Sequence, residues 1–306
     1  MKFENPGKGL EKLSRLFGKT RHAYYDYLQR RKDDVLKDDL ILQLVHEIRK
    51  SLPKTGVRKL HFILRQKLSE HRLNVGRDYL FDLLAKHKLL IRNRKRRVIT
   101  TNSRHWMRKY SNLIKELEII RPEQLWVSDI TYIRLINGFA YLSLITDAYS
   151  RKIVGYSLHK DLSAEGCLKA LQMALLNRNL PYQALIHHSD RGSQYCCKEY
   201  VDLLTANTIA ISMTNNGDPY ENAIAERLNG IIKTEFSLYS SPFGFEENCR
   251  RVQKSISAYN HIRPHASCDY LTPEQAHQKS GVLKKRWKNY NQSLLLTHKF
   301  EKNDLV

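Results

Sequence analysis

The chain has 306 residues and a formal net charge of +21, enough length for a buried core and for more than one domain. It has no long apolar run and a charged start, so we expect no membrane span, no signal peptide and a cytoplasmic location. Five cysteines without a CxxC pair suit a reduced compartment and exclude the zinc-finger class.

The positive charge is concentrated in the first third of the chain. Residues 1–110 hold 29 Lys and Arg against 11 Asp and Glu, whereas residues 111–306 hold 23 against 20. A basic region joined to a nearly neutral one is typical of proteins that bind DNA or RNA. The plainer alternative is a solvated basic surface without a partner.

The chain begins with two short helical patterns in residues 11–31. We assign residues 1–36 to a small helical segment of the helix-turn-helix type, in which Leu13, Leu16 and Phe17 are expected to pack against Tyr24, Tyr27 and Leu28. Any helical hairpin gives a similar pattern, so this segment by itself does not indicate a function.

Three stronger amphipathic stretches follow between residues 38 and 91, and the run "RNRKRR" comes directly after them. We assign residues 38–97 to a helical DNA-binding domain with a basic arm, with an interaction bundle as the alternative. Residues 98–120 are expected to be a linker with room for a short helix. The predicted DNA contacts in the arm are Arg92, Arg94, Lys95, Arg96 and Arg97.

From Leu125 the pattern changes to strands. "WVSDITYIRL" and "FAYLSLITDAYS" flank an Asn137-Gly138 turn and "KIVGYSLH" follows, which predicts an antiparallel meander with the first strand in the centre. Helices and two further strands, the first of them "ALIHHSD", complete the order βββαβαβα. This order predicts an α/β fold with a mixed sheet over residues 121–280, followed by a basic tail over residues 281–306.

Three carboxylates fall where chemistry could use them. Asp129 lies in the first strand, Asp190 ends the fourth strand, which can lie beside the first, and Glu226 lies in a long helix from about residue 220 to 236. At 100° per residue, Asn222 and Lys233 share the stripe of Glu226, opposite an apolar stripe. The alternatives are a turn or cap role for Asp190 and a solvent-facing surface for Glu226.

Three carboxylates without soft ligands favour a hard divalent cation, Mg²⁺ or Mn²⁺. Two such ions can activate an attacking hydroxyl and stabilise the leaving oxygen in a phosphoryl displacement. That chemistry suits a domain joined to a basic DNA-binding region.

These residues stand within the words "WVSDIT", "HSDRGSQY" and "NAIAERLNGIIKTEF", and "YNHIRPH" and "LTPEQA" follow. Sixty residues separate Asp129 from Asp190, thirty-five separate Asp190 from Glu226, and Lys233 comes seven after the glutamate. Over residues 40–278 the pattern resembles the DDE transposases of the bacterial IS-three family, which are related to retroviral integrases. Thr55, where the family often has an aromatic residue, and Glu221, where an aspartate is more usual, depart from it.

The resemblance implies a ribonuclease H-like catalytic core preceded by an all-α helix-turn-helix region. It implies that Asp129, Asp190 and Glu226 are the catalytic residues and bind two Mg²⁺ (or Mn²⁺) ions. It also implies a transposase that binds terminal inverted repeats of double-stranded DNA, as a homo-oligomer, in the cytoplasm at the nucleoid. Relatives are often fused to a helical protein from an upstream frame, which is a further expected partner. Predicted DNA contacts outside the arm are Arg58, Lys59, Asn222, Lys233 and Arg263.

Smaller signals stay open. His187 and His188 could position a scissile phosphate or serve the strand end, and His261 and His265 have the i, i+4 spacing of a metal pair or of a packing motif. Two rival functions are a non-catalytic DNA-binding regulator and a plain ribonuclease H-type nuclease. The intact carboxylates argue against the first, and the basic N-terminal third argues against the second.

Overall fold

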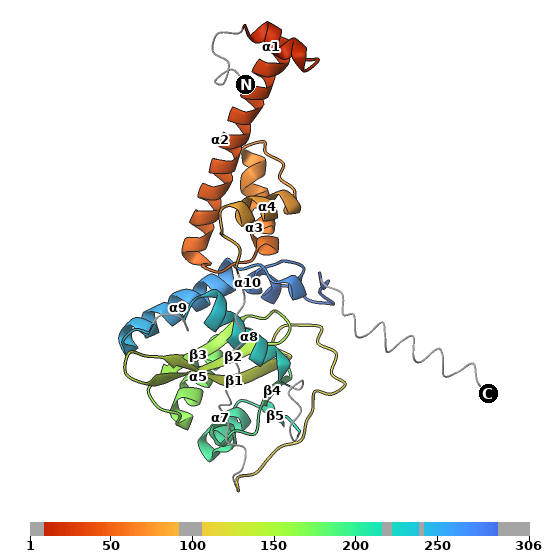
Figure 1. Cartoon of the computed structure of the whole chain (residues 1–306). Helices are drawn as coiled ribbons and strands as arrows, with labels where there is room; N and C mark the ends of the chain where they lie inside the picture. The colour runs from red at the N-terminus through yellow and green to blue at the C-terminus, as the bar shows by residue number, and fades with distance from the viewer. Residues whose placement is uncertain (1–8, 92–105, 216–221, 239–241, 287–306) are drawn as a thin grey trace, which may run out of the picture.

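The computed structural model describes residues 9–91, 106–215, 222–238 and 242–286. A helical N-terminal region stands on one side of an α/β core, and the first half of its longest helix projects away from both (Figure 1). No described helix combines the length and apolar character that a membrane crossing requires.

The N-terminal region consists, where described, of α1 (Leu10–Leu16), α2 (Arg21–Ser51), α3 (Val57–Glu70) and α4 (Arg77–Lys86). Thr20 caps α2, because its hydroxyl oxygen accepts a hydrogen bond from the Ala23 backbone amide at 3.2 Å. The C-terminal half of α2 packs with α3 and α4 through apolar residues spaced three and four apart, which in α3 are Val57, Leu60, Leu64 and Leu68.

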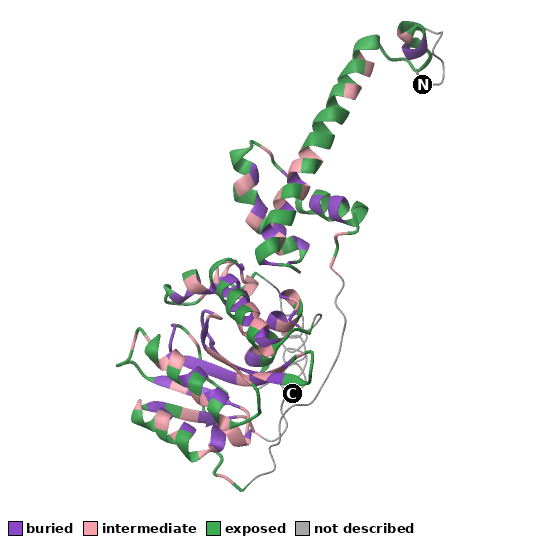
Figure 2. Cartoon of the chain, turned by 90° about the vertical axis from the view of Figure 1, so that its left-hand side faces the viewer, coloured by how far each residue is buried: buried purple, intermediate pink, exposed green. Residues whose placement is uncertain are grey.

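The start of the chain differs from the prediction in two ways. The helix α2 is continuous through residues 36–38, where a boundary was expected, because this stretch contains neither proline nor glycine to end it. Leu16, Phe17 and Tyr27 are 76%, 62% and 53% exposed and do not pack as expected, whereas Leu13 is buried and Tyr24 and Leu28 are partly buried. Figure 2 shows the projecting half of α2 as almost entirely exposed.

Five strands form one sheet in the described part of the core. Their order is β3-β2-β1-β4-β5, with β1, β2 and β3 antiparallel and with β4 parallel to both β1 and β5. Gly138 has a φ of +96°, which the turn between β1 and β2 requires and which glycine adopts without strain. The strands are β1 (Leu125–Arg134), β2 (Phe139–Asp147), β3 (Ile153–His159), β4 (Leu185–Ser189) and β5 (Ile209–Met213).

Helices cover both faces of this sheet. The helix α5 (Ala164–Leu176) packs on β2 and β3, and α7 (Lys198–Ala206) packs near β5, while α8 (Ala223–Glu235) crosses β1 on the other face (Figure 1). Alternation along β2 supplies both cores, because Leu144 belongs to the α8 side and Ile145 to the α5 side. The predicted fold class of an α/β core with a mixed sheet, preceded by an all-α region, is confirmed.

Close packing of α5 depends on Gly155 in β3. A Cβ atom at this position would lie 2.1 Å from the Ala170 carbonyl oxygen and 2.9 Å from the Ala174 Cβ, so a larger residue cannot be accommodated without moving the helix.

Residues 193–206, which follow the fourth strand, form two helices, α6 (Ser193–Cys196) and α7. Cys197 has a ψ of 151° and separates them. The linker over residues 106–120 contains no helix.

The C-terminal part of the core consists of α9 (Phe245–His261), the 3₁₀ turn η1 (Ala266–Cys268) and α10 (Pro273–His277). Thr272 and Gln275 form a capping box at the start of α10. The apolar cluster of the N-terminal helices continues into α8 and α9, and the Phe62 and Tyr270 rings stack at 4.9 Å between centroids. The helical region therefore rests on the α8 face of the core.

Candidate active site

Asp129 and Asp190 belong to neighbouring parallel strands. Asp129 lies in the middle of β1, and Asp190 directly follows the last residue of β4. Val127 pairs with His188, so the same register carried two residues further sets Asp129 opposite Asp190. The expected adjacency of the first and fourth strands is therefore present.

The Asp129 carboxylate is held by two hydrogen bonds. The Asn229 side-chain amide donates to Oδ2 at 2.7 Å, and the Ile130 backbone amide donates to Oδ1 at 2.9 Å. Burial and the nearby charge of Asp190 nevertheless raise the pKa of Asp129 to about 7, and the charge of Glu226 acts in the same direction. The charges of Asp190 and Glu226 therefore both act on the Asp129 carboxylate.

Asp190 is oriented by the turn that follows it. The Gly192 backbone amide donates a hydrogen bond to Asp190 Oδ1 at 2.9 Å. A Cβ atom at Gly192 would lie 3.0 Å from the same carboxylate oxygen. Glycine at this position therefore lets the backbone approach the carboxylate closely enough to bind it.

Glu226 lies in the first turn of α8 and is exposed. The helix buries Leu228, Ile231 and Ile232 against the sheet, so the predicted apolar side is the buried one. On the opposite stripe Glu226 is exposed, whereas Asn222 and Asn229 are buried against the strand that carries Asp129. Asn222 precedes the helix and donates from its side-chain amide to the Ser128 carbonyl oxygen at 3.2 Å. This bond fixes the start of α8 next to the strand that carries Asp129.

The carboxylate oxygens are the ligand type that a hard cation prefers, but they do not form a preformed metal site in the described residues. Within the described ranges, no three His, Cys, Asp or Glu side chains are already gathered as a metal site. The Asp190 and Glu226 charges that raise the pKa of Asp129 are the kind of like-charge repulsion that a divalent cation relieves. The donor set fits Mg²⁺ or Mn²⁺, and the triad itself stays a prediction.

The histidines of β4 are structural. His187 Nε2 lies 2.7 Å from Ser128 Oγ and 2.9 Å from the Tyr200 hydroxyl, and burial lowers the pKa of His187 to about 3. His188 is fully buried, with Nδ1 2.9 Å from Ser212 Oγ. Neither ring reaches solvent, so the strand-end role is favoured over contact with a phosphate. His265 accepts a hydrogen bond from Ser267 and caps η1.

Among the predicted DNA contacts outside the basic arm, three differ in exposure and in the groups that they contact. Arg58 is exposed on α3, and Lys233 places its ammonium 4.7 Å from the centre of the Tyr132 ring. Asn222 is only 6% exposed, and its amide binds the Ser128 carbonyl. The predicted contacts Arg92, Arg94, Lys95, Arg96 and Arg97 lie outside the described residues.

Lys59 and Arg263, also predicted to contact DNA, are joined instead to Glu235 at the end of α8. Lys59 Nζ lies 2.8 Å from Glu235 Oε1, and Arg263 binds both carboxylate oxygens at 2.8 and 2.9 Å. Burial, together with the Arg263 charge, lowers the pKa of Lys59 to about 8 against the pull of Glu235. The Arg263 side chain is only 3% exposed, so this network joins the helical region to the core.

The sequence analysis overlooked two residues that orient the carboxylates, Asn229 and Gly192. Asn229 lies three residues after Glu226 and on the same helical stripe, so the helical projection contained the signal. Gly192 lies two residues after Asp190, and its backbone amide carries the bond, which residue chemistry by itself does not reveal. Glu235 lies on the same side of α8 as the apolar stripe, and no local pattern explains this, because its partners come from α3 and from the segment after α9.

Comparisons with known proteins identify the core. Models of the integrase core domain match residues 120–219 and 207–273. The chain is 32% identical over 273 residues to the insertion element IS600 uncharacterized 31 kDa protein of Shigella sonnei, covering 87% of this chain and 98% of that protein. It is 36% identical over 161 residues to the transposase InsF of insertion sequence IS3A from Escherichia coli K12, covering 52% of this chain and 55% of InsF.

Solved structures of retroviral integrases are also similar. The simian T-cell lymphotropic virus intasome in complex with a PP2A regulatory subunit has a chain that matches with a TM-score of 0.46 at 18% identity, covering 77% of this chain and 79% of that one. The HTLV-2 integrase catalytic core domain in complex with magnesium matches with a TM-score of 0.41 at 20% identity, covering 52% of this chain and 98% of that one.

The IS600 match extends over nearly the whole of that relative, whereas the match to InsF spans about half of InsF. Identity above 30% over such a length, together with the integrase core match, shows a common family. The chain belongs to the IS3 family of insertion-sequence transposases, which is built around an integrase core domain.

Proposed function

We propose that this protein is the transposase of a bacterial insertion sequence, which binds the terminal inverted repeats, nicks DNA and joins strands by Mg²⁺-dependent transesterification. The observation that carries the proposal is the position of Asp129. It lies opposite Asp190 in the strand register, and the charge of Glu226 contributes to its raised pKa. Family membership supports the same reaction class.

Asp129, Asp190 and Glu226 would hold the metal, two Mg²⁺ or Mn²⁺ ions. When bound, such a pair supplies Lewis-acid stabilisation of the attacking and leaving oxygens. The chain's own groups prepare the ligands: Asn229 and the Ile130 amide orient Asp129, and the Gly192 amide orients Asp190. Fixing the carboxylates in advance reduces the reorganisation that substrate binding requires.

The proposed reaction has two balanced steps. A water oxygen forms a bond to phosphorus while the bond from phosphorus to the 3′ oxygen breaks, which releases a strand with a free 3′-OH. That hydroxyl then attacks a second phosphodiester, forming one ester bond as another breaks, so no ATP is consumed. By family resemblance, the product is a joined pair of element ends.

DNA binding is assigned to the basic N-terminal third, with Arg58 exposed on α3 and with the 92–97 arm as further contacts. Lys233 of α8 would contact phosphate near the carboxylates. Two element ends must be brought together before they are joined, so a homo-oligomer on DNA is part of the proposal. An upstream-frame helical partner and a location at the nucleoid belong to it as well.

The test is cleavage of a supercoiled plasmid that carries the element's own ends, incubated with the protein and Mg²⁺. We expect nicking by the wild type, none by Asp190→Asn, and wild-type activity for Asp202→Asn, which removes an exposed carboxylate on α7. Equal cleavage by the wild type and Asp190→Asn contradicts the proposal. Binding of the ends without cleavage by any form favours a regulator, and degradation of an RNA–DNA hybrid regardless of end sequence favours a ribonuclease.

A further inference from the structure

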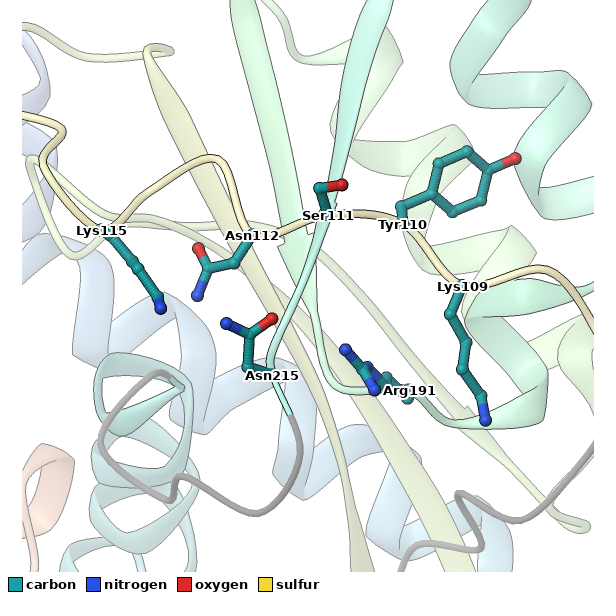
Figure 3. Close-up of a pocket in the computed structure, with 7 residues that line it drawn as sticks. All are labelled: Lys109, Tyr110, Ser111, Asn112, Lys115, Arg191 and Asn215. Atoms are coloured by element: carbon teal, nitrogen blue, oxygen red, sulfur yellow. The ribbon is translucent and has the colours of Figure 1, made fainter.

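A basic groove lies at the same edge of the sheet as Asp190. It has a volume of about 410 Å³, and its lining comes from the linker, from the turn after β4 and from the end of β5 (Figure 3). The lining residues are Lys109, Tyr110, Ser111, Asn112, Lys115, Arg191 and Asn215. Arg191 directly follows Asp190, so the groove includes the residue next in sequence to the proposed catalytic carboxylate.

The linker forms this groove because it runs along β5. The Leu113 backbone amide donates to Ser212 Oγ at 2.9 Å, and the Met213 amide donates to the Ser111 carbonyl oxygen at 3.4 Å. These bonds bring a segment that lies before the first strand to the far edge of the sheet. The position of Lys109 and Lys115 next to Arg191 is therefore a consequence of tertiary structure.

The lining matches an oxyanion. It supplies three cationic side chains, Lys109, Lys115 and Arg191, and no acidic residue is among the seven that line the groove. Lys109, Ser111 and Lys115 are exposed, so the groove is open to a polymer as well as to a small anion. A concentration of Lys and Arg beside hydrogen-bond donors is the usual arrangement for binding phosphate groups.

Asn112 gives a second, independent indication of a ligand. Its Oδ1 accepts a hydrogen bond from the Ile114 backbone amide at 3.0 Å, which fixes the orientation of the side-chain amide. Its Nδ2 is then buried and has no hydrogen-bond partner among the residues that the structure describes, and in Figure 3 it points toward Asn215 and Lys115 across the groove. A buried donor of this kind is normally satisfied, and an oxygen of a bound phosphate would satisfy it.

We propose that this groove binds a phosphodiester of the DNA strand that is being processed, adjacent to the scissile bond. The proposal rests on the function proposed above and adds the residues that hold the strand. Lys109 and Lys115 neutralise the phosphate, Asn112 donates to one of its oxygens, and Arg191 links the groove to the Asp190 turn. The linker then has a direct role in seating substrate.

The test compares two double variants of the full chain that have the same net charge. Lys109→Gln/Lys115→Gln neutralises the groove, whereas Lys254→Gln/Lys279→Gln removes two exposed lysines from α9 and from the end of the core. Affinity for a DNA duplex carrying the element end is measured without divalent metal at several salt concentrations. The groove variant should lower the salt slope by about 0.9, the value for one lost phosphate contact, and the control should leave it unchanged.

Single uncharged methylphosphonate linkages then locate the contact. Placed near the cleavage position, one or two of them should weaken wild-type binding roughly 5-fold at physiological salt and leave the groove variant unaffected. Asn112→Asp, which places a carboxylate in the groove, should weaken binding at the same linkages. An equal response of wild type and groove variant to every linkage overturns the groove assignment.

Two further outcomes separate the groove from the proposed function. If the groove variant loses its response to the uncharged linkages and the wild type cleaves the plasmid, both proposals are supported. If the wild type cleaves the plasmid and the groove variant binds DNA as the wild type does, only the groove assignment is overturned. If inorganic phosphate raises the melting temperature of the wild type but not of the groove variant, and the two bind DNA equally, the ligand is a small anion and the proposal is wrong. Wild-type protein that does not bind DNA at all contradicts both proposals.

Discussion

Asn229 of α8 donates a hydrogen bond to Asp129 of β1 at 2.7 Å, joining two residues one hundred positions apart. The bond ties the helix that carries Glu226 to the strand that carries Asp129. It orients one carboxylate oxygen while the Ile130 amide orients the other. Support of this kind determines how well a carboxylate is placed for a metal ion.

Replacing Asn229 by Leu should therefore reduce strand cleavage by about 10- to 100-fold and raise the Mg²⁺ concentration needed for half-maximal rate. The change removes the donor and leaves Asp129 free to turn. Thr234→Ala, an exposed position on the same helix, is the control and should have no effect. An unchanged metal requirement in Asn229→Leu would show that the bond serves folding only.

Asp129→Asn should stabilise the metal-free protein while abolishing cleavage. Burial and the charge of Asp190 raise the pKa of Asp129 from its ordinary value of 3.8 to about 7, so this group opposes folding increasingly as pH rises from about 4, and fully above pH 7. At pH 8 in EDTA we expect a gain of roughly 0.5–2 kcal/mol in the free energy of unfolding. Mg²⁺ should then raise the melting temperature of the wild type more than that of the variant. A loss of stability in EDTA contradicts the repulsion.

Glu235→Gln should destabilise the protein by roughly 3–5 kcal/mol, because it leaves the Arg263 guanidinium buried without its carboxylate. Urea unfolding measures the change. Glu247→Gln removes an exposed carboxylate that pairs with Arg250 and should cost at most about 1 kcal/mol. The double change Glu235→Leu/Arg263→Met should recover part of the loss, since the buried Arg263 charge is removed together with its partner and only the partly exposed Lys59 is left without it. Equal effects of the two glutamine variants would show that burial of the network is unimportant.

The stability of the core should fall between about pH 6.5 and pH 9 through His277. Burial favours the neutral ring, but the carboxylates of Asp147 and Glu123, 3.7 and 3.6 Å away, outweigh it and raise the pKa of His277 to about 9. Because the folded pKa exceeds the unfolded value of about 6.5, this contribution is complete below pH 6.5 and is lost as pH rises through about 9.

We expect a difference on the order of 2 kcal/mol between the wild type and His277→Gln at pH 6, shrinking toward pH 9.5. Urea unfolding at each pH measures it. His46→Gln, at an exposed position on α2, should track the wild type throughout. A gap between the wild type and His277→Gln that does not change with pH would contradict an ion pair.

Local patterns were sufficient for the core. Alternation and the Asn137-Gly138 turn predicted the meander, and the apolar stripe of α8 predicted which side of that helix is buried, because both depend on neighbours within a few residues. They were insufficient at the start of the chain, where Leu16 and Phe17 look like packing residues but remain exposed. A helix two turns long has few partners within reach, and sequence periodicity does not reveal this.

Sequence alone determined the chemical character of this protein: acidic residues at strand and helix positions where a phosphoryl-transfer site could form, attached to a strongly basic N-terminal third. Tertiary structure decided which charges face one another. The register of β4 on β1 sets Asp190 opposite Asp129, the docking of α3 and of the segment after α9 brings Lys59 and Arg263 to Glu235, and the path of the linker carries Lys109 and Lys115 to Arg191. Contacts between segments so distant along the chain depend on how helices and strands pack, which no local pattern encodes.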